Sequence, residues 1–277
     1  FTPAIIADFI KAAGARFAAL GLSTRFEAAR TSFAPTLRFA TATLEDSLAR
    51  SFIDLLAFHS WGLDRGPEVV GSQNIILSDI AGLAKQYGFR VSVPELGPEV
   101  ASFQLGPSLY SKWNHAWQTA KMYNRIFRYS QASVVNGGWF DRDLPMVDET
   151  TLAPFPSFYV TKQLMDNLPD GSEVVESGAS PDVLWVLAAK HVKNDHFMLQ
   201  VLNTAFTSIE VTFGGVPNTD LTVNRTRDGE NLLQVGFIPA GTGPFALILP
   251  AQSITLLTGK LEKGMVPMAT ATQVTTL

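Results

Sequence analysis

The chain has 277 residues, of which 46% are hydrophobic and 17% are charged, so it has enough apolar material for a globular core and is not a disordered chain. Its net charge of -4 comes without a basic stripe, and no apolar run reaches the roughly 18 residues needed to cross a bilayer, so we expect neither nucleic acid nor a membrane as a partner. The chain contains no cysteine, which excludes thiol catalysis, disulfides and cysteine-ligated metals.

The chain begins with alternating helical and strand-like segments. Residues 1–20 place apolar side chains at spacings of three and four, which predicts a helix with one buried face formed by Ile5, Ile6, Phe9, Ile10, Ala13, Phe17 and Leu20. Residues 22–29 are a plausible strand, and residues 36–51 are predicted to form a second helix. Residues 53–59 are a short apolar run that ends at His59. The order is therefore helix, strand, helix, strand.

The next helix and strand lead to an acidic side chain. Apolar residues on one face of residues 75–87, followed by Gly88 as a C-terminal cap, predict a helix. Residues 89–93 alternate apolar and polar side chains like a strand, and we expect Pro94 to end its pairing just before Glu95. In parallel sheets functional groups gather where strands end, so Glu95 is the first candidate functional residue.

A fourth repeat completes the first predicted domain. We expect a helix at residues 111–130, a strand at 132–140 that contains Trp139, and a last helix at 158–168. Strands that alternate with helices predict a parallel α/β arrangement, and in this size class part of a (β/α)8 barrel is the natural candidate. This domain is expected to cover residues 1–171.

The pattern changes after residue 171 to short alternating runs separated by turn residues. Seven runs are predicted as strands: Val183–Lys190, Phe197–Asn203, Ser208–Phe213, Leu221–Arg225, Leu232–Phe237, Phe245–Leu249 and Ser253–Leu257. Strands at this spacing predict an antiparallel β-sandwich in residues 172–261. Residues 262–277 are rich in threonine and poor in large apolar side chains, so we expect them to form a flexible tail.

Several short motifs follow one another in a characteristic order over the chain to about residue 260. They are Phe9-Ile-Lys, Leu20-Gly-Leu, Ile53 to His59, Val91-Ser-Val-Pro-Glu95, the Trp113–Trp117 helix, Val134 to Trp139, and Pro156-Ser-Phe-Tyr-Val-Thr-Lys-Gln163 before the β-sandwich. This order resembles retaining glycoside hydrolases built on a (β/α)8 barrel with a side β-domain, and family 30 in particular. The resemblance implies that the chain holds barrel strands five to eight and the side domain.

The resemblance also implies roles for individual residues. Glu95, at the end of strand seven, takes the position of the nucleophile, while His59 and Trp139, at the ends of strands six and eight, line the sugar-binding subsite. Members of the family commonly have His-x-Tyr after strand six, where this chain has His59-Ser-Trp61. The family's Asn-Glu acid/base pair would lie before residue 1, so the missing N-terminal half of the barrel is expected as a partner.

The chemistry of the residues leaves alternatives open. Retaining hydrolysis needs two carboxyl groups about 5 Å apart, and Glu95 suits the attacking one, although it could also be a solvated or capping glutamate. His59 could bind a sugar hydroxyl, orient the carboxylate or be a core histidine. Trp61 and Trp139 could stack on a sugar or pack in the core. The histidines lack ligand spacing, so we expect no metal and no cofactor.

We therefore predict the C-terminal part of a retaining glycosidase for β-linked oligo- or polysaccharides, secreted or otherwise outside the cytoplasm. Glu95 is the predicted nucleophile, and His59, Trp61 and Trp139 are predicted to surround the sugar. By itself the chain should have little activity, because its general acid would be missing. A non-catalytic carbohydrate-binding protein and a purely structural α/β scaffold are the alternatives.

Overall fold

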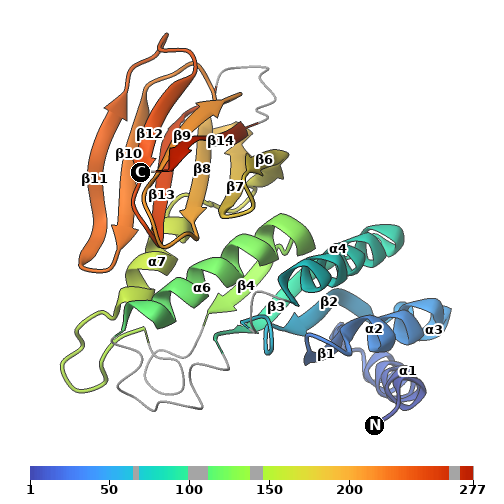
Figure 1. Ribbon diagram of the computed structural model, residues 1–277. Coiled ribbons are helices and arrows are strands. Elements are labelled where there is room, and N and C mark those ends of the chain that lie inside the picture. The colour runs from blue at the N-terminus through green and yellow to red at the C-terminus, as the bar shows by residue number, and fades with distance from the viewer. Residues whose placement is uncertain (65–68, 99–111, 138–145, 262–268, 277) are drawn as a thin grey trace. The chain divides into compact units, whose positions relative to one another are not determined.

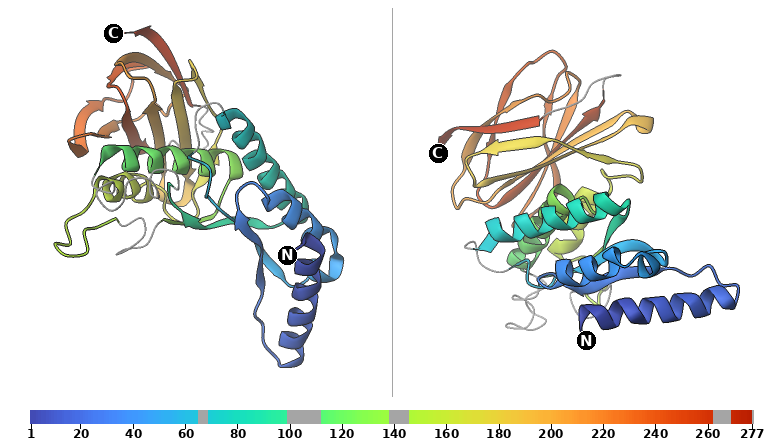
Figure 2. Two further views of the ribbon diagram at one scale, coloured as in Figure 1. Left: turned by 60° about the horizontal axis from the view of Figure 1, so that its bottom comes forward. Right: turned by 90° about the vertical axis from the view of Figure 1, so that its right-hand side faces the viewer.

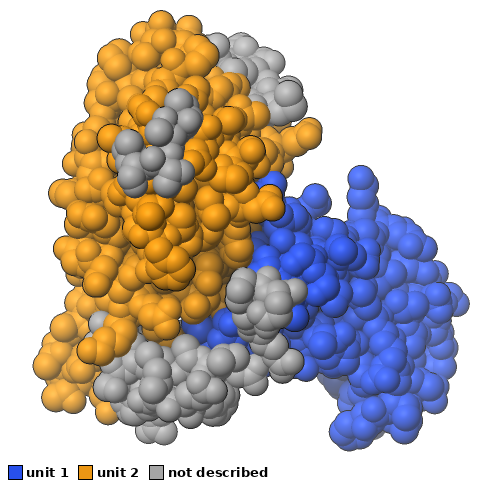
Figure 3. Space-filling model, in the orientation of Figure 1, with its two compact units in different colours: residues 1–106, 125–144 blue, residues 107–124, 145–277 orange. Residues whose placement is uncertain are grey.

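A computed structural model describes residues 1–64, 69–98, 112–137, 146–261 and 269–276. The chain forms two compact units, one of residues 1–106 and 125–144 and the other of residues 107–124 and 145–277 (Figure 3). This division does not coincide with the predicted boundary at residue 171. Residues 107–124 and 145–171 group with the β-rich unit, because the helices in these segments share a buried cluster with its strands.

The first unit is a parallel sheet with helices, as the alternating pattern predicted (Figure 1). Its strands pair in the order β1-β2-β3-β4, and every pair is parallel. Strand β2 has the predicted bounds, residues 53–59. The elements are α1 (Pro3–Ala19), β1 (Phe26–Ser32), α2 (Thr36–Glu45), α3 (Ser47–Arg50), β2 (Ile53–His59), α4 (Val70–Tyr87), β3 (Arg90–Leu96), the π-helical turn η3 (Ile126–Ser130) and β4 (Val134–Gly137).

The first helix exists as predicted, and Ile10 is buried as expected, but the rest of the expected face was predicted incorrectly. Ile5 and Phe9 were expected to be buried, yet they are 49% and 60% exposed. The residues that α1 buries are Ala7, Ile10 and Gly14. The reason is a close approach: a Cβ atom at Gly14 would lie 2.3 Å from Cγ of Phe52, so the helix presents its small side chains to the unit. Helix α1 packs beside α2 (Figure 2).

The second unit contains two β-sheets that pack around one apolar core. All seven predicted strands are present, and the sheets have the orders β11-β10-β13-β8-β7-β5 and β12-β9-β14-β6. The elements are α6 (Trp113–Arg125), α7 (Pro156–Met165), β5 (Glu173–Val175), β6 (Ser177–Ser180), β7 (Leu184–His191), η4 (Val192–Asn194), β8 (His196–Asn203), β9 (Ile209–Gly214), β10 (Leu221–Arg227), β11 (Glu230–Ile238), β12 (Phe245–Leu249), β13 (Ser253–Lys260) and β14 (Ala269–Thr276).

Helices α6 and α7 belong with these sheets because they cover the outer face of the larger one. Trp117 of α6 and Val160 of α7 share a buried cluster with Leu202 of β8 and Ile254 of β13. The alternate residues of β8, Phe197, Leu199 and Val201, instead face the core between the sheets. Trp117 is thus a core residue, and the stacked ring of Trp113 is partly buried against the same cluster, in line with the core packing that their spacing predicted.

The expectation of a flexible tail was wrong for residues 269–276. They form β14, which pairs antiparallel with β9 and parallel with β6. Ala269 and Ala271 are fully buried in the core between the sheets, whereas Thr270 and Thr272 are exposed. The segment lacks large apolar side chains because small alanines fill the space, and the alternating threonines are typical strand formers.

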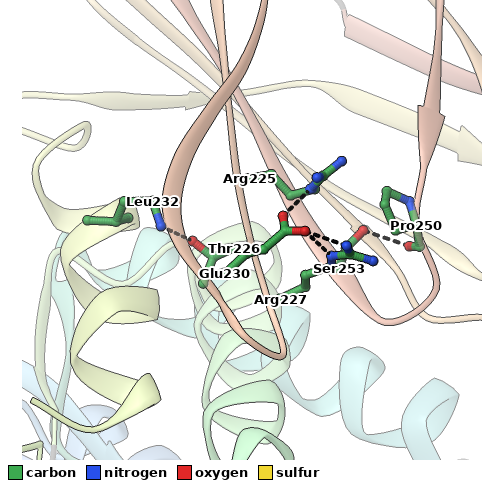
Figure 4. Close-up of polar contacts among 7 residues, drawn as sticks. All are labelled: Arg225, Thr226, Arg227, Glu230, Leu232, Pro250 and Ser253. Carbon is green, nitrogen blue, oxygen red and sulfur yellow. Dashed lines mark hydrogen bonds and ion pairs between the residues drawn. The ribbon is translucent and has the colours of Figure 1, made fainter.

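The hairpin of β10 and β11 is held by a local ion-pair cluster (Figure 4). The Glu230 carboxylate accepts from Nε of Arg225 at 2.7 Å and from Nε of Arg227 at 2.6 Å. These two guanidinium groups hold the pKa of Glu230 below its usual range. Both cations are paired with one carboxylate inside the hairpin, so the cluster stabilises the hairpin and offers no evident binding site.

No helix within the described ranges combines the length and the hydropathy required to span a membrane.

Candidate functional site

Two neighbouring parallel strands of the first unit end beside each other and carry the candidate site. Strand β2 pairs with β3 through residues 55–57 and 90–92, and the strands then continue past this ladder. His59 is the last residue of β2, Trp61 follows it, and Glu95 is the penultimate residue of β3. Carboxyl ends of parallel strands lie at one edge of the sheet, so these three side chains meet.

The contacts among them converge on one oxygen atom. Glu95 Oε2 accepts a hydrogen bond from the indole Nε1 of Trp61 at 3.0 Å, and Nδ1 of His59 lies 3.1 Å from the same oxygen. Among the residues that the structure describes, no side chain hydrogen-bonds to Oε1. The Glu95 side chain is 29% exposed and that of His59 is 16% exposed, so the carboxylate is partly open to solvent.

The charge state of His59 decides what kind of contact this is. Burial lowers the pKa of His59 below its ordinary value of 6.5; Glu95 and Glu27 raise it, and Arg30 lowers it further. Burial is the largest of these effects, so the imidazole is neutral at neutral pH. The contact with Glu95 is therefore the close approach of a neutral imidazole, with Nδ1 within hydrogen-bonding distance of Oε2, rather than an ion pair.

The backbone that carries Glu95 departs from a regular strand. Strand β3 was predicted to end at Pro94, but it continues to Leu96, which pairs with Gly137 of β4. The register shifts between Val93 and Leu96, so Pro94 and Glu95 have no ladder partner on β4. Proline has no N–H to donate, and an irregularity of this kind is where a strand tolerates it.

A buried arginine holds the loop that carries Trp61. Arg125 is 2% exposed and donates to the Leu63 carbonyl at 2.8 Å, to Gln73 Oε1 at 2.8 Å and to Asn74 Oδ1 at 2.7 Å. Gln73 in turn donates to the Gly62 carbonyl at 2.7 Å. Burial lowers the pKa of Arg125 to about 10, which leaves it charged at neutral pH. The loop after β2 is thus fixed to the start of α4.

The structure brings together three of the four predicted site residues. Trp139 lies outside the described residues. Glu27 is the second residue of β1, and its carboxylate lies 3.9 Å from the Arg30 guanidinium. Sequence reasoning missed Ser60, Gln73 and Arg125. Their contacts join residues 11 to 62 positions apart, and no local motif marks them.

No protein-family sequence model matches this chain, and no curated protein matches it. Solved structures do resemble it. A GH30 endoxylanase from Clostridium papyrosolvens C71 has a TM-score of 0.74 at 17% identity, and a GH30 subfamily 8 xylanase from Clostridium acetobutylicum has 0.71 at 17%; each match covers 94% of this chain and 61% of the other. A GH51 α-L-arabinofuranosidase from Thermotoga petrophila has a TM-score of 0.61 at 11% sequence identity. This match covers 94% of the present chain and 63% of the arabinofuranosidase chain.

The resemblance to family 30 glycoside hydrolases is therefore confirmed in the fold, over almost the whole of this chain. This chain spans about 61% of the length of the two xylanases. A glycoside-hydrolase-like fold follows from these similarities, whereas fold alone does not fix an activity, which must be argued from the site.

Proposed function

We propose that this chain is the C-terminal part of a retaining glycosidase in which Glu95 is the nucleophile. The observation that carries this proposal is the Glu95 carboxylate at the ends of two parallel strands, with Oε2 held by His59 and Trp61 and Oε1 without a partner among the described residues. A nucleophile must be fixed in place and still have an oxygen available for attack.

The chemistry assigns different tasks to the two carboxylate oxygens. Oε1 of Glu95 attacks the anomeric carbon, the glycosidic bond breaks, and a separate carboxylic acid protonates the departing oxygen; water then releases the sugar from Glu95. The N–H groups of Trp61 and His59 hold Oε2 throughout. Trp61 thus takes the place of the tyrosine that the family commonly has there, with its indole N–H as the donor.

The general acid is proposed to come from a polypeptide segment that precedes Phe1. Strand β1 is at one edge of the parallel sheet, and the apolar side chains of Ile5 and Phe9 are exposed on α1. An unpaired strand edge and an exposed apolar helix face both favour burial against further structure. A preceding half barrel would supply that structure together with the acid.

Covalent labelling tests the proposal. The chain joined to the polypeptide encoded directly upstream is treated with an activated 2-deoxy-2-fluoro-β-glycoside, which stalls the enzyme as its glycosyl intermediate. We expect the adduct on the peptide that contains Glu95 and its loss in Glu95→Gln, while Glu27→Gln keeps the adduct. An adduct on another residue, or an upstream segment without an acid at a strand end, would refute the proposal.

The xylanases among the structural neighbours make β-linked xylan the first substrate to examine. Polymers of this kind lie outside the cell that degrades them, so we propose that the protein acts outside the cytoplasm. Activity on soluble xylo-oligosaccharides, measured by release of reducing ends, checks the substrate class. Activity on α-linked glucans with none on β-linked glycans would contradict it.

A non-catalytic carbohydrate-binding protein is the second candidate, because the described site offers one carboxylate where retention needs two. In that case xylo-oligosaccharides should bind to the chain and no adduct should form on Glu95. Glu95→Gln separates the candidates: it abolishes hydrolysis by an enzyme, whereas on a binding surface it only exchanges one carboxylate for an amide that still forms hydrogen bonds.

A further inference from the structure

We infer that Ser60 is a positioning residue for Glu95, and in its catalytic meaning this inference rests on the proposed function. Ser60 lies between His59 and Trp61 and is completely buried. Its backbone N–H donates to the Glu95 carbonyl at 3.0 Å. Its side-chain Oγ accepts from the Gly97 N–H at 3.1 Å. Ser60 therefore forms hydrogen bonds with the backbone at two positions, the Glu95 carbonyl and the Gly97 N–H.

The backbone at Glu95 needs such a hold. The ladder between β2 and β3 ends at Ser92, and the pairing with β4 is interrupted between Val93 and Leu96. The proline at position 94 has no N–H with which to join either ladder. The two hydrogen bonds of Ser60 are the contacts that replace the missing ladder on the β2 side of this stretch.

Ser60 also couples the backbone of Glu95 to its side chain. The two residues that flank it, His59 and Trp61, supply both groups in contact with Glu95 Oε2. Residues 59–61 therefore contact Glu95 at its carbonyl and its carboxylate, and they hold the chain two residues later through the Gly97 N–H. The Ser60 carbonyl accepts a hydrogen bond from Leu63 N at 2.9 Å, which fixes residues 59–61 to the loop that follows them. A small displacement at Ser60 therefore moves the contacting groups of His59 and Trp61 relative to Oε2.

This inference can be tested on the chain as it stands, without activity. The five tryptophans of the chain, labelled with ¹⁵N at the indole nitrogen, give separate N–H resonances, and Trp61→Phe assigns the one of interest. The position and the solvent exchange rate of this resonance are then compared in the unsubstituted chain, in Ser60→Ala and in Glu95→Gln. Ser72→Ala is the matched control, because Ser72 is exposed and donates to the Val69 carbonyl at the start of α4.

We expect Ser60→Ala to move the Trp61 resonance toward its position in Glu95→Gln and to speed its exchange on the order of tenfold, the size expected from one weakened hydrogen bond. Ser72→Ala should leave both unchanged. A Trp61 resonance that stays in place in a folded Ser60→Ala chain overturns the inference, since a merely structural serine would lower stability alone.

A second measurement needs no substitution, in case Ser60→Ala fails to fold. The Gly97 backbone N–H should exchange slowly in the unsubstituted chain because it donates to buried Oγ; exchange at the rate of an open amide overturns the inference. Labelling of Glu95 by the fluoro-glycoside is independent of both readouts. Failure of the proposed function and failure of the positioning role are therefore distinguishable.

Discussion

The buried histidine of α6 should make the β-rich unit less stable in mild acid. His115 is 2% exposed, and burial lowers its pKa from 6.5 to about 4. The neutral form is thus favoured in the folded state, whereas the unfolded chain takes up a proton below pH 6.5. The sign follows: stability is unaffected above pH 6.5 and falls as the pH drops from 6.5 toward 4.

The size of the effect follows from the two pKa values. A difference of 2.5 pKa units corresponds to about 3.4 kcal/mol when the group is fully titrated, and integration between pH 7.5 and pH 5 gives about 2 kcal/mol. For a unit of this size, a change of about 2 kcal/mol lowers the melting temperature by roughly 4 to 8 °C.

Urea unfolding at a series of pH values measures this loss. His115→Phe removes the titrating group and should flatten the pH profile by about 2 kcal/mol between pH 7.5 and pH 5 relative to the unsubstituted chain. Thr119→Val, one turn further along α6, removes the hydrogen bond to the His115 carbonyl without a change in titration. It should lower stability equally at every pH. Parallel pH profiles for the unsubstituted chain and His115→Phe would refute the reasoning.

Three further predictions concern other parts of the molecule. Gly14→Ala forces a Cβ atom into an aromatic ring and should destabilise by about 1 to 3 kcal/mol, whereas Gly82→Ala, with open space in α4, should stabilise by up to about 1 kcal/mol in the same thermal unfolding assay. Removal of residues 269–277 should abolish cooperative unfolding of the β-rich unit, as seen by circular dichroism; an unchanged transition would contradict the role of β14. Glu95→Gln should lower the pKa of His59 further, because the charge of Glu95 raises that pKa in the unsubstituted chain. NMR titration of the His59 ring measures the change, and an unchanged or higher pKa in Glu95→Gln would contradict the prediction.

The order of elements was predictable wherever a periodic pattern lies on a single element. Strand β2 alternates little, but its apolar run is bounded by polar residues, and its predicted limits match the structure. The buried face of α1 was not predictable, because it depends on the contact between Gly14 and Phe52, which the sequence separates by 38 positions. Strand β14 was missed for a related reason: its alanines are core residues because β14 pairs with both β9 and β6, and this pairing joins segments that are far apart in the sequence.

The sequence was enough to single out Glu95, but not the residues that hold it and its neighbours in place. Glu95 stands out because an apolar strand, a proline and a turn surround it. Trp61 was expected to bind sugar or to pack in the core, and its role as donor to the carboxylate required the parallel register of β2 and β3. Arg125 looks like an ordinary helix-end cation in the sequence. Only the fold shows that its guanidinium is buried among neutral acceptors.

If the proposed function holds, the geometry of the first unit bears on how much activity an isolated chain would keep. Among the described residues, every group that holds Glu95 comes from β2, from the loop after it or from β3 itself, so the proposed nucleophile is held within one unit. Loss of the general acid then costs a factor of about 10² to 10⁴ without disorder at Glu95. An aryl glycoside with an excellent leaving group needs little protonation. If the proposed function holds, such a substrate should recover activity more readily than a natural glycan, because the attacking half of the site is already assembled.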